Sequence, residues 1–303
     1  RCVPLRSKDT VSGVIDVDNR LQAGIFVQDD LDLLVAIASN AAIAIENARL
    51  YQVAVEKGRM ERELQVARGV QASLLPQETP QVPGWAFEAR WQPARTVSGD
   101  YYDFIALDGG QLGLVISDVS DKGMPAAVFM ALTRSTIRAT ISHLSSPAEA
   151  IAEANRLICA DSAEGMFVTL FYAQLDPTSG RLTYVNAGHN PPLVCRAGEA
   201  EHLEELRPTG MALGIVEDFP FEQRTLELLP GDSILLYTDG VPDASNEGQE
   251  HFGMDRLRRA ILEYQSAPVS GMVAALEGSI GDFTGGETQF DDIAILAVKR
   301  LGM

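Results

Sequence analysis

The sequence contains little that would support a secreted protein or a thiolate metal site. Among its 303 residues are three cysteines, Cys2, Cys159 and Cys195, and none of them has the CxxC spacing. An odd count without that spacing argues against a disulfide framework and a zinc site. The four histidines also lack a metal-binding spacing, and no signal peptide is recognisable. We therefore expect a cytoplasmic protein.

Long hydrophobic runs and positive charge are scarce as well. The longest apolar stretch, residues 31–45, is interrupted by Asp32, Ser39 and Asn40 and is too short for a membrane span. Lys and Arg number 24 against 42 Asp and Glu, so the net charge is −18. Such a chain repels nucleic-acid phosphates and anionic membranes. We expect neither a nucleic acid nor a membrane as a partner.

The hydrophobic fraction of 46% and the charged fraction of 22% are typical of a soluble globular protein. Residues 1–28 are expected to form strands and turns, with strand-like runs at 11–17 and 21–26. A long helix is predicted at residues 29–75, because its apolar residues recur at helical spacing. Prolines at 76, 80 and 83 then end the helix and form a boundary.

The second half of the predicted helix carries a heptad pattern, and Gly58 is a candidate for a break. Two interpretations stay open. The helix packs on its own domain, or it is a linker helix that dimerises or carries a signal. The second interpretation predicts a homodimer formed through the linker helix. The seam consists of Met60, Leu64, Ala67, Gln71 and Leu74.

Residues 84–303 are predicted to form one domain. Several of its strands follow one another without intervening helices. This order favours an α+β fold with mostly antiparallel sheets and external helices over a doubly wound parallel sheet. The strand-like runs are residues 85–91, 101–107, 112–119, 167–175, 181–186, 221–228, 233–238 and 293–299. The helical segments are residues 125–141, 147–161, 254–263 and 269–283.

Several aspartates stand at an end of an apolar strand, next to a glycine or a turn. Asp118 and Asp239 follow such runs, whereas Asp100 and the pair Asp291–Asp292 precede them. Rigid strand ends suit a preorganised site. Carboxylates that converge there raise each other's pKa unless a cation lies between them, and Mg²⁺ and Mn²⁺ prefer oxygen ligands. The cluster predicts a divalent-metal site, although each aspartate alone is more often a turn residue or a helix cap.

Six motifs occur in order between residues 63 and 299, and together they make a specific match. The region resembles the PPM superfamily (protein phosphatase 2C-like), and within it the bacterial SpoIIE-type branch of sporulation and stress regulators. The motifs are ARGVQASLLP at 67–76, VSGDYYD at 97–103, SDVSDKG at 117–123 with PAA at 125–127, NAGHNPP at 186–192, YTDGV at 237–241 and DDI at 291–293.

The resemblance implies an α/β/β/α sandwich with two Mn²⁺ or Mg²⁺ ions between the sheets. It implies that Asp118 bridges both ions and that the carbonyl of Val119 joins it. Asp239 and Asp291 match ligands of the first ion, and Asp100 matches an aspartate that binds metal directly or through water. Two further aspartates match less closely: Asp292 stands where many relatives carry asparagine, and Asp103 has a weaker match still.

The implied activity is hydrolysis of phosphoserine or phosphothreonine on a protein by a metal-bridging hydroxide. Relatives commonly act on small anti-anti-sigma (STAS-type) factors, which implies such a substrate. The general acid stays open between a metal-bound water and His189, although the GHNP segment more often makes a structural turn. Lys122 either binds phosphate or is solvated. The alternative function is a catalytically inactive signalling module, which the presence of every expected aspartate disfavours.

Residues 4–52 resemble the closing half of a GAF sensor domain. Residues 13–17 would be its late strand, and residues 31–51 would be its exit helix, ending in IENARLY. The predicted organisation is therefore a GAF-like C-terminal part at 1–52, a linker helix and boundary at 53–83, and a phosphatase domain at 84–303.

Overall fold

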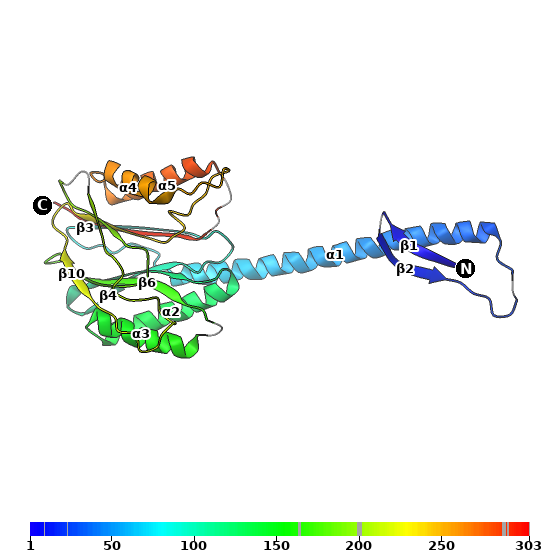
Figure 1. Ribbon diagram of the computed structural model, residues 1–303, viewed down its shortest axis with the longest axis horizontal. Coiled ribbons are helices and arrows are strands. Elements are labelled where there is room, and N and C mark those ends of the chain that lie inside the picture. The colour runs from blue at the N-terminus through cyan, green and yellow to red at the C-terminus, as the bar shows by residue number, and fades with distance from the viewer. Residues whose placement is uncertain are drawn as a thin grey trace. The chain divides into compact units, whose positions relative to one another are not determined.

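A computed structural model describes residues 1–8, 10–22, 24–162, 165–198, 202–286, 289 and 291–302. The chain forms two compact units, Arg1–Val66 and Ala67–Met303, and the helix α1 (Gln28–Leu74) contributes to both. Figure 1 shows the elements of each unit.

The first unit consists of a two-stranded hairpin and the N-terminal part of α1. Strands β1 (Cys2–Ser7) and β2 (Thr10–Asp16) pair antiparallel, with Cys2 opposite Asp16. Of its described apolar residues, Val3, Ala38 and Ala42 are the buried ones. So small a core is what a fragment of a domain would show. The GAF-like assignment stays a prediction.

Two expectations for this unit were wrong. The described residues between 21 and 26 form no strand, and Leu21 is 98% exposed. The Asn19 side chain accepts hydrogen bonds from the backbone N–H groups of Leu21 and Gln22, so a local turn uses the donors that a ladder would need. The helix also runs through Gly58 without a break. Ion pairs of the i,i+4 type on both sides, Lys57–Glu61 and Arg59–Glu63, support it there.

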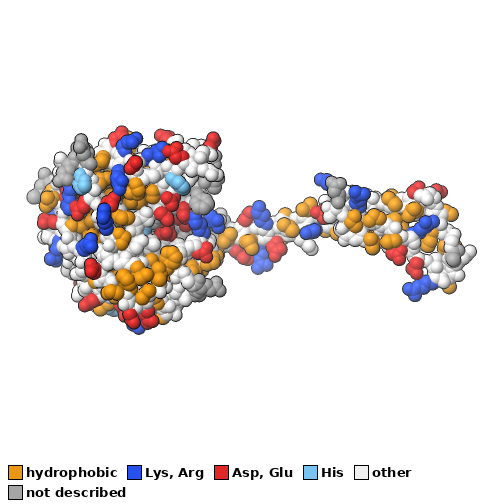
Figure 2. Space-filling model, in the orientation of Figure 1, with side chains coloured by type: hydrophobic (Ala, Val, Ile, Leu, Met, Phe, Trp, Pro, Cys, Tyr) orange, Lys and Arg blue, Asp and Glu red, His pale blue; other side chains and the backbone are white. Residues whose placement is uncertain are grey.

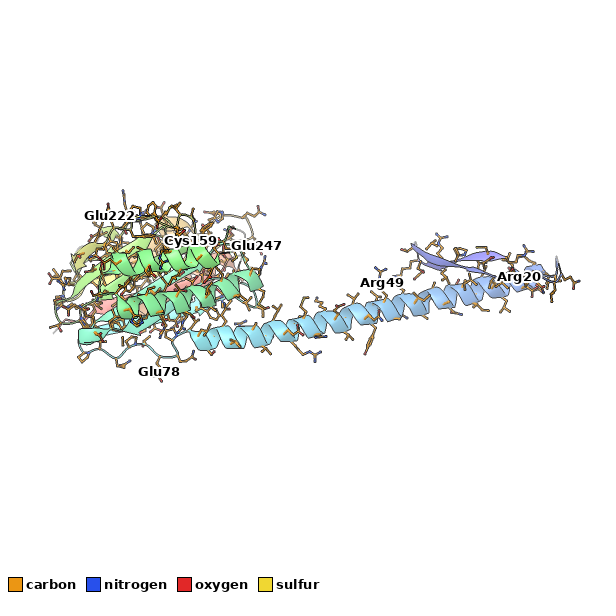
Figure 3. The ribbon with its side chains drawn as sticks, turned by 90° about the horizontal axis from the view of Figure 1, so that it is seen from below. Arg20, Arg49, Glu78, Cys159, Glu222 and Glu247 are labelled. Atoms are coloured by element: carbon orange, nitrogen blue, oxygen red, sulfur yellow. The ribbon has the colours of Figure 1, made fainter. Side chains whose placement is uncertain are left out.

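One part of α1 is strongly apolar. An 18-residue window in it has a mean hydropathy of 1.4, so by length and composition alone the helix could cross a membrane. The helix also carries charged side chains, and Figure 3 shows Arg49 projecting outward from it. That no membrane is a partner therefore remains a prediction.

The second unit contains two five-stranded antiparallel sheets. The first has the order β10 (Arg224–Glu227), β7 (Arg181–Ala187), β6 (Val168–Leu175), β5 (Leu112–Val119) and β4 (Tyr101–Ala106). The second has the order β3 (Trp85–Gln92), β12 (Ile293–Arg300), β11 (Ser233–Tyr237), β8 (Leu193–Cys195) and β9 (Leu203–Glu205).

Helices cover the outer face of each sheet, as Figure 1 shows. Helices α2 (Met124–His143) and α3 (Pro147–Asp161) share a hydrophobic core with the first sheet. Helices α4 (Gly253–Glu263) and α5 (Val269–Thr284) share one with the second sheet, and another core lies between the sheets. A short 3₁₀ turn, Asp108–Gly110, links β4 to β5. The predicted α/β/β/α sandwich is confirmed.

The central strands are buried on both faces, which is why they read as continuous apolar runs. In β5, Leu114 and Ile116 enter the core between the sheets, whereas Val115 and Val119 face α2 and α3. The short strands β8 and β9 were not predicted. The run expected at 221–228 is a strand only at Arg224–Glu227, because Phe221 packs into the core of the first sheet instead.

Candidate active site

Strand register brings the candidate aspartates together in two pairs. In the first sheet Tyr101 lies opposite Ser117, so Asp100, just before β4, comes beside Asp118 near the end of β5. In the second sheet Tyr237 lies opposite Ile295, so Asp239, just after β11, comes to the start of β12, two residues from the position opposite Asp291. The charge of Asp291 acts on Asp239.

Two glycines allow the loops that carry these aspartates to approach closely. A side chain at Gly99 would come within 3.0 Å of the carbonyl oxygen of Val119. A side chain at Gly240 would meet the carbonyl oxygen of Asp292 at 1.9 Å, which no larger residue could accommodate without a backbone shift. The VSGD and YTDGV motifs therefore need their glycines for packing around the site.

The aspartates lie in one another's electrostatic field, across the two sheets. Burial, and then the charge of Asp239, raise the pKa of Asp118 to about 7. Burial, and then the charge of Asp118, raise the pKa of Asp100 well above its usual value. Burial, and then the charge of Asp291, raise the pKa of Asp239 to about 6. A cation placed among these groups would relieve the repulsion.

One cationic side chain already lies at this cluster. Lys122 stands on the loop between β5 and α2, and its Nζ is 2.8 Å from Oδ2 of Asp291. Its charge also lowers the pKa of Asp239, against the larger effect of burial. Figure 2 shows acidic side chains gathered beside basic ones on this unit. In the described part of the chain, no three acidic, histidine or cysteine side chains lie together at metal-binding distances.

The donor set nevertheless fits a hard divalent cation. It consists of carboxylate oxygens, and Oδ2 of Asp100 is buried without a hydrogen-bond partner among the described residues. A buried carboxylate oxygen without a donor is costly unless something positive meets it. Residues Asp100, Asp118, Asp239 and Asp291, with the Val119 carbonyl, are thus the candidate ligands.

Asp292 and Asp103 each bind a neighbouring part of the fold, although the charge of Asp292 also acts on Asp100 and Asp118. Oδ1 of Asp292 accepts a hydrogen bond from the N–H of Ala94 at 2.7 Å, and Oδ2 accepts one from the N–H of Gly99 at 2.9 Å. Asp103 is buried and forms a two-point ion pair with Arg138 of α2 at 2.6 and 2.7 Å. Asp292 therefore fixes the loop before Asp100, and Asp103 fastens β4 to α2.

His189 is placed as a structural residue. Its ring Nδ1 lies 2.9 Å from the hydroxyl of Thr169, and its backbone N–H donates to the side chain of Asn186. Burial lowers its pKa to about 3, so the ring is neutral near neutral pH. A neutral buried imidazole of this kind is a poor proton donor to a leaving group.

Sequence reasoning missed one residue that contacts the site's backbone. Gln71, assigned to the heptad seam, is 4% exposed and hydrogen bonds to both backbone groups of Ser98. The signal was present in the sequence, because a polar residue in an apolar seam needs a partner.

Residues 108–301 match the family model of stage II sporulation protein E, SpoIIE. The chain belongs to the SpoIIE family. Among curated proteins it is similar to protein IcfG of Synechocystis sp., with 31% identity over 97% of this chain and 50% of that protein. It is also 29% identical to the phosphoserine phosphatase RsbU of Bacillus subtilis, over 78% of this chain and 70% of RsbU. The chain thus spans about half the length of IcfG.

Solved structures of PP2C phosphatase domains share the fold of this family member. The SiaA-PP2C domain of Pseudomonas aeruginosa has a TM-score of 0.73 at 22% identity, covering 81% of this chain and 99% of that domain. The catalytic domain of the serine/threonine phosphatase PstP, which was solved with two manganese ions, has a TM-score of 0.51 at 19% identity, covering 72% and 99%. Both the predicted PP2C-like fold and the predicted SpoIIE-type family are confirmed.

Proposed function

We propose that this chain is a metal-dependent protein phosphatase that hydrolyses phosphoserine or phosphothreonine on a regulatory protein. The observation that carries the proposal is the meeting of two aspartate pairs, one from each sheet, in which burial and the neighbouring carboxylates raise the pKa values of Asp100, Asp118 and Asp239. The similarity to RsbU, named a phosphoserine phosphatase, supports the choice of substrate class.

Two Mn²⁺ or Mg²⁺ ions would be held by the candidate ligands, with Asp118 between them. Asp239 and Asp291 would bind the first ion, and Asp100 and the Val119 carbonyl would complete the set. Such a pair of ions supplies an acidified water as nucleophile and neutralises charge on the phosphoryl oxygens. The unpartnered Oδ2 of Asp100 supports this assignment.

Two side chains of the protein bear on the mechanism: Lys122 would orient the phosphate, and His189 is a poor candidate for the proton donor. The side chain of Lys122 is 30% exposed while it contacts Asp291, so its ammonium can also meet a phosphoryl oxygen from the solvent side. His189 is neutral and buried, which disfavours it as the general acid. We assign the proton for the leaving alkoxide to water.

Hydrolysis of p-nitrophenyl phosphate with added Mn²⁺, and again with EDTA, tests the activity. We expect turnover with Mn²⁺ and none with the chelator. Full activity in EDTA would overturn the metal-dependent mechanism. Mn²⁺ binding in calorimetry without turnover on either the aryl phosphate or a phosphoserine peptide would favour the catalytically inactive module instead.

We further propose a STAS-type anti-anti-sigma factor as the substrate and the cytoplasm as its location. Membership of the SpoIIE family supports this choice. Purified STAS-type protein carrying phosphoserine should lose its phosphate to the chain in Mn²⁺, whereas the same protein carrying phosphotyrosine should not. Equal rates on both would overturn the assignment of serine or threonine.

A homodimer through α1 completes the proposal. Continued towards the N-terminus at heptad spacing, the seam includes Ile43, Leu50 and Val53, whose side chains are 52%, 57% and 58% exposed, but also the charged residues Glu46 and Lys57. Exposed apolar side chains along one face of a helix are stabilised in water when a second surface covers them. The sequence interpretation in which the linker dimerises is thereby supported.

Two substitutions within one turn of α1, on different faces of the helix, test the dimer. Leu64 lies on the seam and Val66, which is 69% exposed, lies off it. Leu64→Asp should lower the sedimentation mass from dimer to monomer, because a charge would be buried without a partner. Val66→Asp should leave the mass unchanged. A monomeric wild type would overturn the dimer.

A further inference from the structure

Gln71 occupies a position where packing alone would favour leucine. The side chain is 4% exposed, and its amide makes two hydrogen bonds to one residue. Nε2 donates to the carbonyl oxygen of Ser98 at 2.5 Å, and the N–H of Ser98 donates to Oε1 at 3.0 Å. The Gln71 amide thus satisfies both backbone groups of a residue that is itself fully buried.

Ser98 belongs to the loop that delivers Asp100. This loop, between β3 and β4, has no regular secondary structure, so side chains must fix its backbone. Asp292 holds the N–H groups of Ala94 and Gly99, and the indole N–H of Trp91 donates to the carbonyl oxygen of Asp100 at 3.0 Å. Among these interactions with the loop, those of Gln71 are made by a residue of α1.

The hydrogen bonds between Gln71 and Ser98 lie two residues from the candidate ligand Asp100. Gly99 packs against the carbonyl oxygen of Val119. Asp100 follows it, and its buried Oδ2 has no hydrogen-bond partner in the described part of the chain. A shift of Ser98 would therefore move a carboxylate and press on a carbonyl, both of which are assigned to the ions. Positions of ligand atoms must hold to within a fraction of an ångström for tight binding.

We infer that Gln71 is a positioning residue of the metal site, which sets the place of Asp100 through the backbone of Ser98. The inference rests on the proposed metal-dependent function. The last turns of α1 would then belong to the catalytic unit, because they hold the loop that carries Asp100. The glutamine in the ARGVQASLLP motif thereby has a role that apolar packing does not require.

Calorimetric titration with Mn²⁺ tests the inference without relying on activity. Gln71→Leu removes both hydrogen bonds and leaves the backbone groups of Ser98 unpaired. We expect Mn²⁺ binding to weaken about 10-fold or more, as is typical when a partner that orients a metal ligand is lost. The matched control is Gln65→Leu, the same change at an exposed glutamine of the same helix, which should bind Mn²⁺ as wild type does.

Turnover of p-nitrophenyl phosphate across a range of Mn²⁺ concentrations gives a second readout. Gln71→Leu should require more Mn²⁺ for half-maximal rate and should recover most of the wild-type rate at saturation, because every ligand is still present. A merely structural role would lower the melting temperature in EDTA and leave the Mn²⁺ affinity unchanged. That outcome would overturn the inference.

A second variant covers the case in which Gln71→Leu does not fold. Gln71→Met keeps the unbranched shape and loses only the hydrogen bonds, and it should weaken Mn²⁺ binding in the same direction. Wild-type Mn²⁺ affinity in folded Gln71→Met would overturn the positioning role. The two proposals fail separately: a wild type that binds no Mn²⁺ refutes the metal-dependent function, whereas equal binding by wild type and variant refutes only the role of Gln71.

Discussion

The two aspartate pairs of the site differ in how much water reaches them. In the first sheet, Asp100 is 2% exposed and Asp118 is partly buried, and burial is the leading cause of the raised pKa of each. In the second sheet, Asp291 is 27% exposed and has the ammonium of Lys122 beside it. Asp100 thus depends most on a bound cation for its ionised form. Asp239 and Asp291 have the ammonium of Lys122 nearby, although burial still raises the pKa of Asp239 to about 6. We therefore propose that the first sheet contributes most to the affinity for metal and that the substrate enters beside the second sheet.

Removing a charge from the pair in the first sheet should have the largest effect. Asp118→Asn should lower turnover of p-nitrophenyl phosphate by about 10³-fold, since in the proposed site this carboxylate would be a ligand of both ions, which stabilise charge in the transition state. The loss should persist at high Mn²⁺, because the proposal assigns no other side chain to both ions. Circular dichroism should show the wild-type fold. Wild-type turnover in this variant would show that the aspartates have been assigned wrongly.

Substitutions in the second pair, Asp239 and Asp291, should lower turnover strongly, and added Mn²⁺ should restore part of it. Asp239→Asn and Asp291→Asn each remove a ligand of one ion, and we expect about 10²-fold lower turnover at limiting Mn²⁺. Raising Mn²⁺ should restore part of the rate, unlike in Asp118→Asn. If these two variants respond to Mn²⁺ as Asp118→Asn does, the proposed division between the pairs is wrong.

The pH dependence of metal binding should report the protonation of Asp118. The pKa of Asp118 is raised to about 7 in the metal-free protein, so this carboxyl carries a proton at pH 6 and loses it by pH 8. An ion that binds at pH 6 must displace that proton, and affinity should fall by up to about tenfold per pH unit below 7. Calorimetry in two buffers of different ionisation enthalpy should show proton release at pH 6 and little at pH 8.5. Equal proton release at both pH values would contradict the raised pKa.

Local signals predicted much of the fold. Helix α3 was expected at residues 147–161 and is found at Pro147–Asp161, because a first-turn proline follows Ser146, whose hydroxyl caps the helix by accepting from the N–H of Glu149. The ends of apolar runs also placed Asp118 and Asp239 correctly at the ends of strands.

Features that depend on contacts between distant residues were not predictable in this way. Gln71 and Ser98 are 27 positions apart, and only the folded chain brings their polar groups together. Strands β8 and β9 have three residues each, too few to show a period of two. That aspartates from both sheets meet in one site was predicted from the resemblance to a family, because their spacing in the sequence does not show it.

The smallest effect is expected at Asp292, which precedes a strand of the second sheet and contacts the loop that carries Asp100. Its two carboxylate oxygens each accept one backbone N–H, from Ala94 and Gly99. Asp292→Asn keeps one acceptor and turns an NH₂ group towards the other N–H, so one buried donor loses its partner. We expect a loss of Mn²⁺ affinity of about tenfold or less, since the change reaches Asp100 only through backbone, with turnover near wild type at saturating Mn²⁺. Asp292→Ala, which removes both acceptors, should weaken Mn²⁺ binding further. A turnover defect in Asp292→Asn that saturating Mn²⁺ does not restore would instead make Asp292 a participant in the chemistry.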